Sequence, residues 1–224
     1  MTATNATTTP AQLSAIAREC FRTGGLAMRT LQHLRPHICP FEELLPEIPE
    51  GARVLDIGCG GGLLAALVCA TRRPARFVGF DSSAPAIAVA QANVGAIAAL
   101  AGVTPEFLRL DVGAPWPAGP FDCVTMIDVL HHIPPPAQRG AIEMALRAVE
   151  PGGRFVYKDM TRRDLPRRMA NQMHDLVMAR QWVNPAPIDD VVAWATAAGA
   201  RLVRRGDFNR YWYGHELAVF ERVR

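Results

Sequence analysis

The chain has 224 residues, of which 50% are hydrophobic, and it carries a formal net charge of +3 at pH 7. This length and apolar content predict one domain with a substantial core. The charge is spread along the chain, and its densest part, the arginines within 162–168, is interpreted as a solvated helix face. We therefore expect no nucleic-acid partner.

Neither the cysteines nor the N-terminus indicates export or membrane insertion. The five cysteines form no CxxC pair and no Cys/His cluster, so we expect reduced thiols and no metal site, as in a cytoplasmic protein. The first ten residues lack the apolar centre of a signal peptide, and no apolar run is long enough to cross a bilayer. We expect a disordered tail over 1–10 and no membrane partner.

Helical spacing of apolar residues begins after this tail. It predicts a helix from Ala11 that ends at Gly24 and Gly25, and a second helix over Leu26–Leu34. Prolines at 36, 40, 46 and 49 then interrupt any regular element before residue 52. We interpret residues 11–50 as a helical lid on a domain that spans 51–224.

From residue 52, short apolar runs alternate with helical stretches. The runs lie at 52–57, 75–80, 105–110, 121–127 and 152–158, and the helical stretches at 62–72, 84–100 and 136–149. The runs are almost continuously apolar, which is expected when helices cover both faces of a parallel sheet. The pattern therefore predicts a doubly wound α/β fold.

The end of the chain departs from this rhythm. A helical insertion is expected at about 160–185, strongest over 164–182, and another helix at 188–198. Two strand-like runs follow, at 200–205 and 216–223, with only about ten residues between them. So short a connection cannot join parallel neighbours, so the last two strands must form an antiparallel hairpin.

The most informative segment is 54–62, which reads VLDIGCGGG. Asp56 ends an apolar run, and Gly58, Gly60 and Gly62 complete the pattern Asp-x-Gly-x-Gly-x-Gly. A turn of this kind, placed between a strand and a helix, lets a nucleotide approach backbone N–H groups. The dinucleotide fingerprint G-x-G-x-x-G does not describe this spacing.

Two more aspartates follow predicted strands. Asp81 ends the second strand, where a carboxylate can accept hydrogen bonds from both hydroxyls of a ribose. Asp111 ends the third strand, where it can accept from the exocyclic amine of an adenine. Ligands of open α/β sheets bind at this edge. The local alternatives are that Asp81 caps the helix from 84 and that Asp111 only shapes a turn.

Together with Phe121-Asp122…His131-His132 and Glu150-Pro151-Gly152-Gly153, these motifs resemble the class I S-adenosylmethionine-dependent methyltransferases over about residues 50–160. The resemblance implies a Rossmann-like seven-stranded sheet of order 3-2-1-4-5-7-6 with strand 7 antiparallel. It implies S-adenosylmethionine as cofactor and S-adenosylhomocysteine as product. The cofactor site implied by the resemblance consists of Asp56, Gly58, Cys59, Gly60, Asp81, Ser82, Asp111, Val112 and Ile127.

Methyl transfer requires the acceptor, the methyl group and the sulfur to be aligned, and a hydroxyl acceptor benefits from a general base. His131 and His132 directly follow the fourth strand at the cofactor edge. We predict that one of them is the base, with His132 favoured, because histidine titrates near neutral pH. The alternative is that the pair packs beside the cofactor or caps the next helix.

The acceptor site is expected at the same edge. Residues 207–215 are interpreted as the hairpin turn, and Tyr211, Tyr213 and His215 within it are candidate acceptor contacts. Lys158, at the end of the fifth strand, is another. Arg22 and Arg29 are candidates for the cofactor carboxylate.

These features favour a small-molecule acceptor that is methylated on oxygen, in a hydroxyl or carboxyl group, with carbon as the next choice. The fourth strand ends in Asp-Val-Leu-His-His rather than the Asn-Pro-Pro-Tyr pattern typical of enzymes that methylate bases or glutamine. Two other classes stay open: a non-catalytic module that binds S-adenosylmethionine, and a nicotinamide-dependent oxidoreductase. The second does not account for the terminal hairpin.

Overall fold

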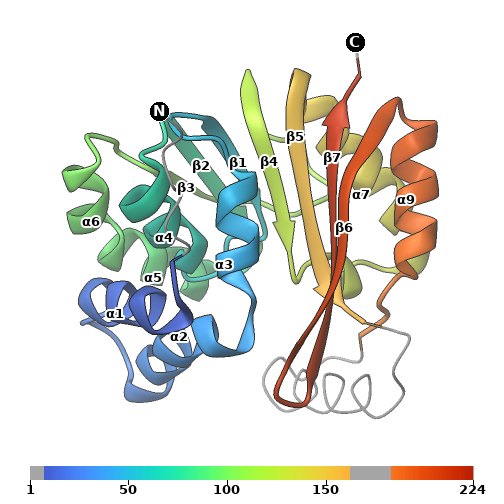
Figure 1. The fold of residues 1–224 in the computed structure, drawn as a ribbon. Coiled ribbons are helices and arrows are strands. Elements are labelled where there is room, and N and C mark those ends of the chain that lie inside the picture. Colours follow the sequence, from blue (N-terminus) through green and yellow to red (C-terminus); the bar gives the residue numbers. More distant parts are fainter. Residues whose placement is uncertain (1–7, 162–182, 224) are drawn as a thin grey trace, which may run out of the picture.

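A computed structural model describes residues 8–161 and 183–223 (Figure 1). The sheet has seven strands in the order β3-β2-β1-β4-β5-β7-β6. Strand β7 is antiparallel to both of its neighbours, and the other pairs are parallel. Both the order and the antiparallel strand confirm the prediction. The strands are β1 (Arg53–Ile57), β2 (Arg76–Asp81), β3 (Glu106–Arg109), β4 (Phe121–Ile127), β5 (Val149–Met160), β6 (Ala200–Arg210) and β7 (Tyr213–Arg222).

Helices cover both faces of this sheet. One apolar cluster joins one face to α1, α3, α4, α5 and α6, and a second cluster joins the other face to α7 and α9. This arrangement explains why the central strands are apolar on both sides. The helices are α1 (Pro10–Cys20), α2 (Leu26–Ile38), α3 (Phe41–Leu44), α4 (Leu63–Arg72), α5 (Ala84–Asn93), α6 (Gly95–Leu100), α7 (Pro135–Ala148) and α9 (Ile188–Ala197), with 3-10 turns η1 (Leu45–Glu47) and η2 (Leu130–His132).

The predicted helix over 84–100 is two helices, α5 and α6, which meet at Val94. The Asn93 side chain accepts from the backbone N–H and the hydroxyl of Thr23, which lies between α1 and α2. Gly95 follows immediately and weakens helix continuation. The break therefore arises from a tertiary contact that joins α5 to the N-terminal helices.

The terminal hairpin is longer than predicted. Strand β6 continues to Arg210 and β7 begins at Tyr213, so the turn contains only Tyr211 and Trp212 rather than residues 207–215. Tyr211 has a φ of 55°, which allows this tight reversal. Side chains of the edge strand β6 alternate between exposed and half-buried positions, with Arg201 and Arg205 exposed and Arg204 and Arg210 half-buried. The sequence of β6 is largely polar, so the apolar pattern predicted only its first half as a strand.

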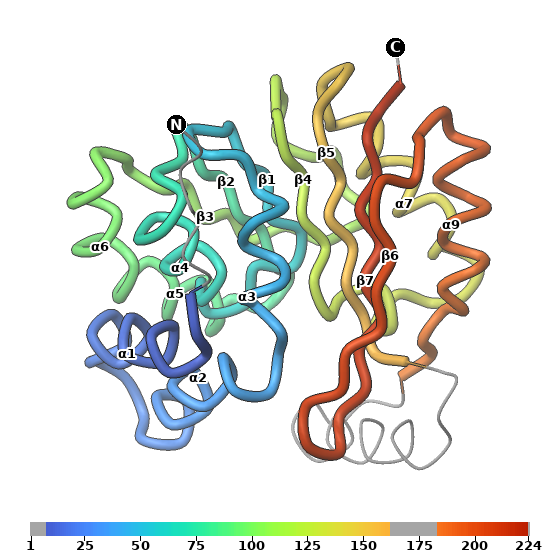
Figure 2. Tube along the Cα trace, viewed as in Figure 1, coloured from blue at the N-terminus to red at the C-terminus, as the bar shows by residue number. Residues whose placement is uncertain are grey.

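The N-terminal helices and the hairpin tip lie at the end of the sheet where the parallel strands finish. Figure 1 shows β4 and β5 ending at the lower edge, beside the hairpin turn, and Figure 2 shows α1 and α2 at the same end. Helix α1 begins at Pro10 behind a capping box made by Thr9 and Gln12. Residues 1–7, and the predicted helix at 164–182, lie outside the described residues.

Three further properties concern the cysteines, membrane-spanning helices and metal-ligand clusters of the described residues. All five cysteines are buried and none is in a disulfide. Within residues 8–161 and 183–223, every helix is too short or too polar to span a lipid bilayer. The same ranges hold no cluster of three or more His, Cys, Asp or Glu side chains suited to a metal ion.

Candidate active site

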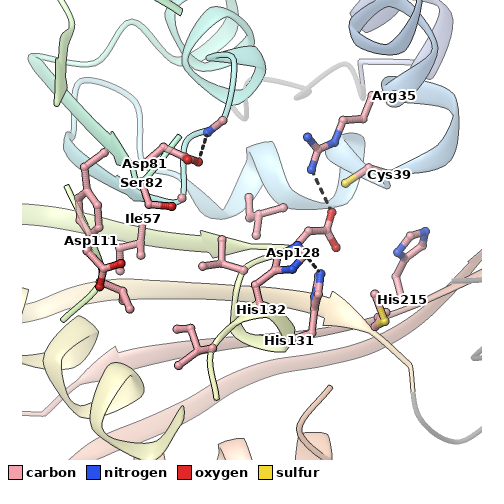
Figure 3. A pocket seen from close by; sticks show the side chains of 18 of the residues that line it. Arg35, Cys39, Ile57, Asp81, Ser82, Asp111, Asp128, His131, His132 and His215 are labelled. Atoms are coloured by element: carbon pink, nitrogen blue, oxygen red, sulfur yellow. Dashed lines mark hydrogen bonds and ion pairs between the residues drawn. The ribbon is translucent and has the colours of Figure 1, made fainter. Parts of the chain in front are cut away.

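A cleft of about 730 Å³ opens at the carboxyl ends of the parallel strands (Figure 3). The loops after β1, β2, β3 and β4 line one part of it, while α2, η2 and β7 line another. Of the residues predicted for the site, those in the lining are Gly58, Gly60, Asp81, Ser82, Asp111, Val112, Ile127, His131, His132, Tyr213 and His215. The rule that ligand-binding groups gather at the carboxyl ends of strands therefore placed most of them.

The glycine turn between β1 and α4 requires glycine for two different reasons. Gly58 has a φ of 67°, and a Cβ on it would lie 2.4 Å from the Val129 side chain. Gly60 has a φ of 52°, and a Cβ there would meet no atom within 4 Å. Because Gly60 lines the cleft, its backbone is open to a ligand.

The aspartates at the end of β2 and just after β3 both line the cleft, but they accept hydrogen bonds from different backbone N–H groups. Asp81 accepts hydrogen bonds from the N–H groups of Gly60, at 2.9 Å, and Ser83, at 2.8 Å. It thereby ties the glycine turn to the start of α5. Asp111 accepts from the Gly113 N–H at 2.9 Å, which is the turn-shaping role that the sequence left open.

Asp56 and Cys59 do not line the main cleft. Both lie beneath the glycine turn, beside a separate cavity of about 20 Å³. The Thr125 hydroxyl donates to the Asp56 carboxylate at 2.7 Å, and burial raises the pKa of Asp56 to about 7. These two residues thus support the turn from below in this structure, and a direct cofactor contact for them stays a prediction.

A cluster of charged groups lies beside the cleft and includes Asp128 and Arg35, which were not predicted as site residues, together with Lys158, which was. Asp128, directly after β4, accepts from the Lys158 ammonium at 2.5 Å and from the Arg35 guanidinium of α2 at 3.3 Å. The Lys158 side chain is 1% exposed, and the two cations hold the pKa of Asp128 well below its usual range against the effect of burial. Figure 3 shows Arg35 reaching down from α2 to Asp128.

Among the described residues, the arginine that lines the cleft is Arg35, and not Arg22 or Arg29. Arg22 is paired with Glu19 and its side chain is 71% exposed, and neither Arg22 nor Arg29 lines the cleft. The sequence carried no local signal for Arg35, because its partner Asp128 is 93 residues away.

The two histidines are linked to a buried carboxylate. Asp159, at the end of β5, accepts from His131 through both the backbone N–H, at 3.2 Å, and the ring Nδ1. His131 Nε2 lies 3.0 Å from His132 Nε2, and both rings line the cleft. The structure thus places His132, His131 and Asp159 in one hydrogen-bonded chain. Figure 3 shows its two histidines next to Asp128.

The predicted acceptor residues divide into two pairs. Tyr213 and His215, on β7, line the cleft, and His215 Nε2 lies 2.8 Å from the Ile38 carbonyl oxygen at the end of α2. Lys158 is buried behind Asp128 and does not line the cleft. Tyr211 is 69% exposed at the hairpin tip and is also absent from the lining. Tyr211 was expected at the site because a longer loop was predicted. In the observed two-residue turn it lies at the hairpin tip, away from the cleft.

Sequence comparison identifies the family. The methyltransferase domain family matches residues 32–205, which is most of the chain. A ubiquinone biosynthesis O-methyltransferase from Paracidovorax citrulli is 30% identical over 168 residues, which cover 72% of this chain and 66% of that protein. Another, from Alkalilimnicola ehrlichii, is 36% identical over 113 residues, which cover 50% of this chain and 43% of that protein. The chain thus spans only part of the length of these relatives.

Structural comparison gives the same fold. The magnesium protoporphyrin IX methyltransferase from Synechocystis PCC 6803 with bound S-adenosylhomocysteine superposes with a TM-score of 0.67 at 19% identity, and each chain covers 93% of the other. The [4+2]-cyclase SpnF superposes with a TM-score of 0.61 at 17% identity, over 96% of this chain and 97% of that one. At such identities the likeness shows the fold alone, and the family match decides the assignment. The chain belongs to the class I S-adenosylmethionine-dependent methyltransferases.

Proposed function

We propose that this protein transfers a methyl group from S-adenosylmethionine to a hydroxyl oxygen of a small molecule, with His132 as the general base. The observation that carries the proposal is the chain Asp159–His131–His132, which leads from a buried carboxylate to the cleft. A base held in this way suits an acceptor that must lose a proton. The curated relatives named as O-methyltransferases support oxygen as the acceptor atom.

The residues of one half of the cleft fit the cofactor. Its sulfonium makes the methyl group electrophilic when the cofactor is bound. Asp81 is placed to accept from the ribose hydroxyls, because its carboxylate lines the cleft and has lone pairs beyond those used by Gly60 and Ser83. The open backbone at Gly60 leaves room for the chain of the methionine part. Asp111 is the candidate for the adenine amine.

The hydrogen bonds support Nδ1 of His132 as the atom that takes the proton. A carboxylate only accepts, so Asp159 places a hydrogen on His131 Nδ1. A neutral His131 then accepts at Nε2, so His132 donates from its own Nε2 and carries its lone pair at Nδ1. During transfer, Nδ1 of His132 receives the hydroxyl proton while the oxygen–carbon bond forms. The bound cofactor would supply the electrophilic methyl group and keep the electron pair on its sulfur, so the positive charge would end on the histidine chain.

The other half of the cleft suits a partly apolar acceptor. Leu31 and Ile38 from α2 and Met160 from β5 contribute apolar surface, while Tyr213 and His215 contribute polar atoms. We propose that α2 acts as the lid over this acceptor site, because it supplies part of the wall and is tied to the sheet through Arg35 and Asp128.

Replacing Asp81 by alanine is expected to weaken binding of S-adenosylhomocysteine by at least about tenfold, since a charge-assisted hydrogen bond contributes roughly 1.5–3 kcal/mol. Isothermal titration measures this, with NAD as a second titrant that should not bind. Asp111→Ala is the matched control at the next strand, with a smaller expected loss. Because Asp81 also holds the glycine turn, urea unfolding of each variant must show a native-like transition. Unchanged affinity would remove Asp81 from the cofactor site.

The acceptor atom is tested with S-adenosylmethionine that carries a trideuterated methyl group. Incubation with small phenols, catechols, aromatic amines and enolisable diketones, followed by mass spectrometry, identifies which atom gains the label. We expect label on hydroxyl oxygen. Label on carbon would replace the oxygen assignment. Binding of S-adenosylhomocysteine without transfer to any acceptor would favour a non-catalytic module.

A further inference from the structure

His215 is a buried histidine at the acceptor end of the cleft, and its second ring nitrogen has no hydrogen-bond partner in the part of the chain that the structure describes. The residue is 6% exposed and lies on β7, where it pairs with Met160 of β5 and Phe208 of β6. Figure 3 shows its ring rising from the hairpin strand towards the end of α2. The ring nitrogen Nδ1 is buried, with no hydrogen-bond partner among the described residues.

The contact with α2 determines which nitrogen carries the hydrogen. Nε2 lies 2.8 Å from the Ile38 carbonyl oxygen, and a carbonyl can only accept, so the hydrogen is on Nε2. Burial and the nearby Lys158 ammonium lower the pKa of His215 to about 3, with Arg210 acting in the same direction and Asp128 opposing it. The ring is therefore neutral near pH 7, and Nδ1 presents a lone pair rather than an N–H group.

A buried lone pair of this kind requires a donor from a bound molecule. A buried polar group without a hydrogen bond costs free energy, so a ligand that supplies an O–H or N–H gains over one that does not. A carbonyl, carboxylate or methoxy oxygen would place its own lone pairs against Nδ1 and be rejected. The site therefore selects for a hydrogen-bond donor at this position.

We propose that His215 is an acceptor-recognition residue whose Nδ1 accepts a hydrogen bond from a second hydroxyl group of the acceptor. This rests on the proposed oxygen methylation, in which the first hydroxyl gives its proton to His132. The substrate class is then a small, neutral, partly apolar molecule with at least two hydroxyl groups. Leu31, Ile38 and Met160 supply the apolar wall for its carbon skeleton.

A consequence is that such an acceptor gains a single methyl group. Once one hydroxyl is methylated, the remaining hydroxyl reaches His132 only if the product binds the other way round. The methoxy oxygen would then face His215 Nδ1 and offer no hydrogen. The same residue that selects the diol therefore disfavours its product as a second substrate.

The test uses the three dihydroxybenzene isomers, their monomethyl ethers and phenol as acceptors. Wild-type protein should methylate its best dihydroxybenzene with a kcat/KM about tenfold above that of the matching ether, which corresponds to about 1.4 kcal/mol. In His215→Phe this ratio should fall to near one, with most of the change in KM. In His215→Asn, whose amide oxygen lies near the position of Nδ1, part of the ratio should return. A ratio that persists in His215→Phe, or that is absent from the wild type, overturns the proposal.

Two measurements separate this proposal from the proposed function. Titration with S-adenosylhomocysteine should give the same affinity for all three proteins, and failure to bind would refute the cofactor assignment instead. Nitrogen-15 spectra of histidine-labelled protein need no turnover. They should show His215 as the neutral Nε2–H form, with its Nδ1 resonance moved by a dihydroxybenzene in the S-adenosylhomocysteine complex but not by the dimethyl ether. The opposite tautomer, or equal shifts for both compounds, would overturn the role of His215 even in an active methyltransferase.

Discussion

Replacing His132 by alanine is expected to lower kcat by about 10²–10⁴, the usual contribution of a positioned general base. The affinity for S-adenosylhomocysteine should stay within about twofold of the wild type, because the loss is confined to the transition state. His132 lines the cleft at the end of a hydrogen-bonded chain, so its removal takes away the proton acceptor without disturbing the glycine turn. Steady-state kinetics with a hydroxylated acceptor, together with calorimetric titration, measure the two quantities.

Two controls distinguish a base from a residue that only fills space. Imidazole added to His132→Ala should restore part of the lost rate, because it can take up the proton in the vacated volume. Asp159→Asn should also slow the reaction and change its pH profile, because an amide can donate to His131 Nδ1 and reverse the tautomers along the chain. Imidazole should not rescue that variant. If both His132→Ala and Asp159→Asn keep the wild-type kcat, the acceptor needs no base from this chain.

Replacing Asp128 by asparagine is expected to lower the free energy of unfolding by about 3–5 kcal/mol, the range found when one partner of a buried ion pair is removed. Asparagine suits the backbone here, because Asp128 has a φ of 57° and asparagine tolerates that region well. The substitution therefore tests the charge rather than the turn. It leaves the Lys158 ammonium, whose side chain is 1% exposed, without its carboxylate. Urea denaturation measures the change.

The double variant Asp128→Asn with Lys158→Met provides the matched comparison. It removes the buried cation as well, so it should be more stable than the Asp128→Asn single variant. The Asp128→Asn variant should also gain stability as pH rises towards 10. An unpaired buried lysine has a lower pKa in the folded than in the unfolded state, so deprotonation of Lys158 favours the folded protein. A single variant within about 0.5 kcal/mol of the wild type would show that water or the Asp159 carboxylate compensates the Lys158 charge.

The sequence alone determined the fold and the cofactor edge. Apolar runs alternating with helical stretches are a local signal, and parallel strands in a covered sheet produce it directly. The connection between the last two strands is too short to join parallel neighbours, so its length alone predicted the antiparallel hairpin. Gly58, Gly60, Asp81 and Asp111 all line the cleft because each lies at or just after the end of a strand, and strands of one parallel sheet end at one edge.

Element boundaries were less predictable where the sequence is polar. Strand β6 lies at the sheet edge, and every second side chain along it is exposed to solvent. The sequence of its second half is therefore polar and resembles that of a loop. For this reason the turn was predicted over residues 207–215, and Tyr211 was wrongly expected to lie at the site. The break between α5 and α6 has a different cause, because Thr23 from another part of the chain binds Asn93.

Only the tertiary structure decided the charged and hydrogen-bonded contacts of the site. Arg35 meets Asp128 across 93 residues, and His215 meets the Ile38 carbonyl across 177. Asp159 reaches His131 from the neighbouring strand. No local spacing encodes these pairs, because a hydrogen bond depends on the positions of two atoms within a few tenths of an ångström, and only the packing of α2, β5 and β7 around the cleft sets those positions.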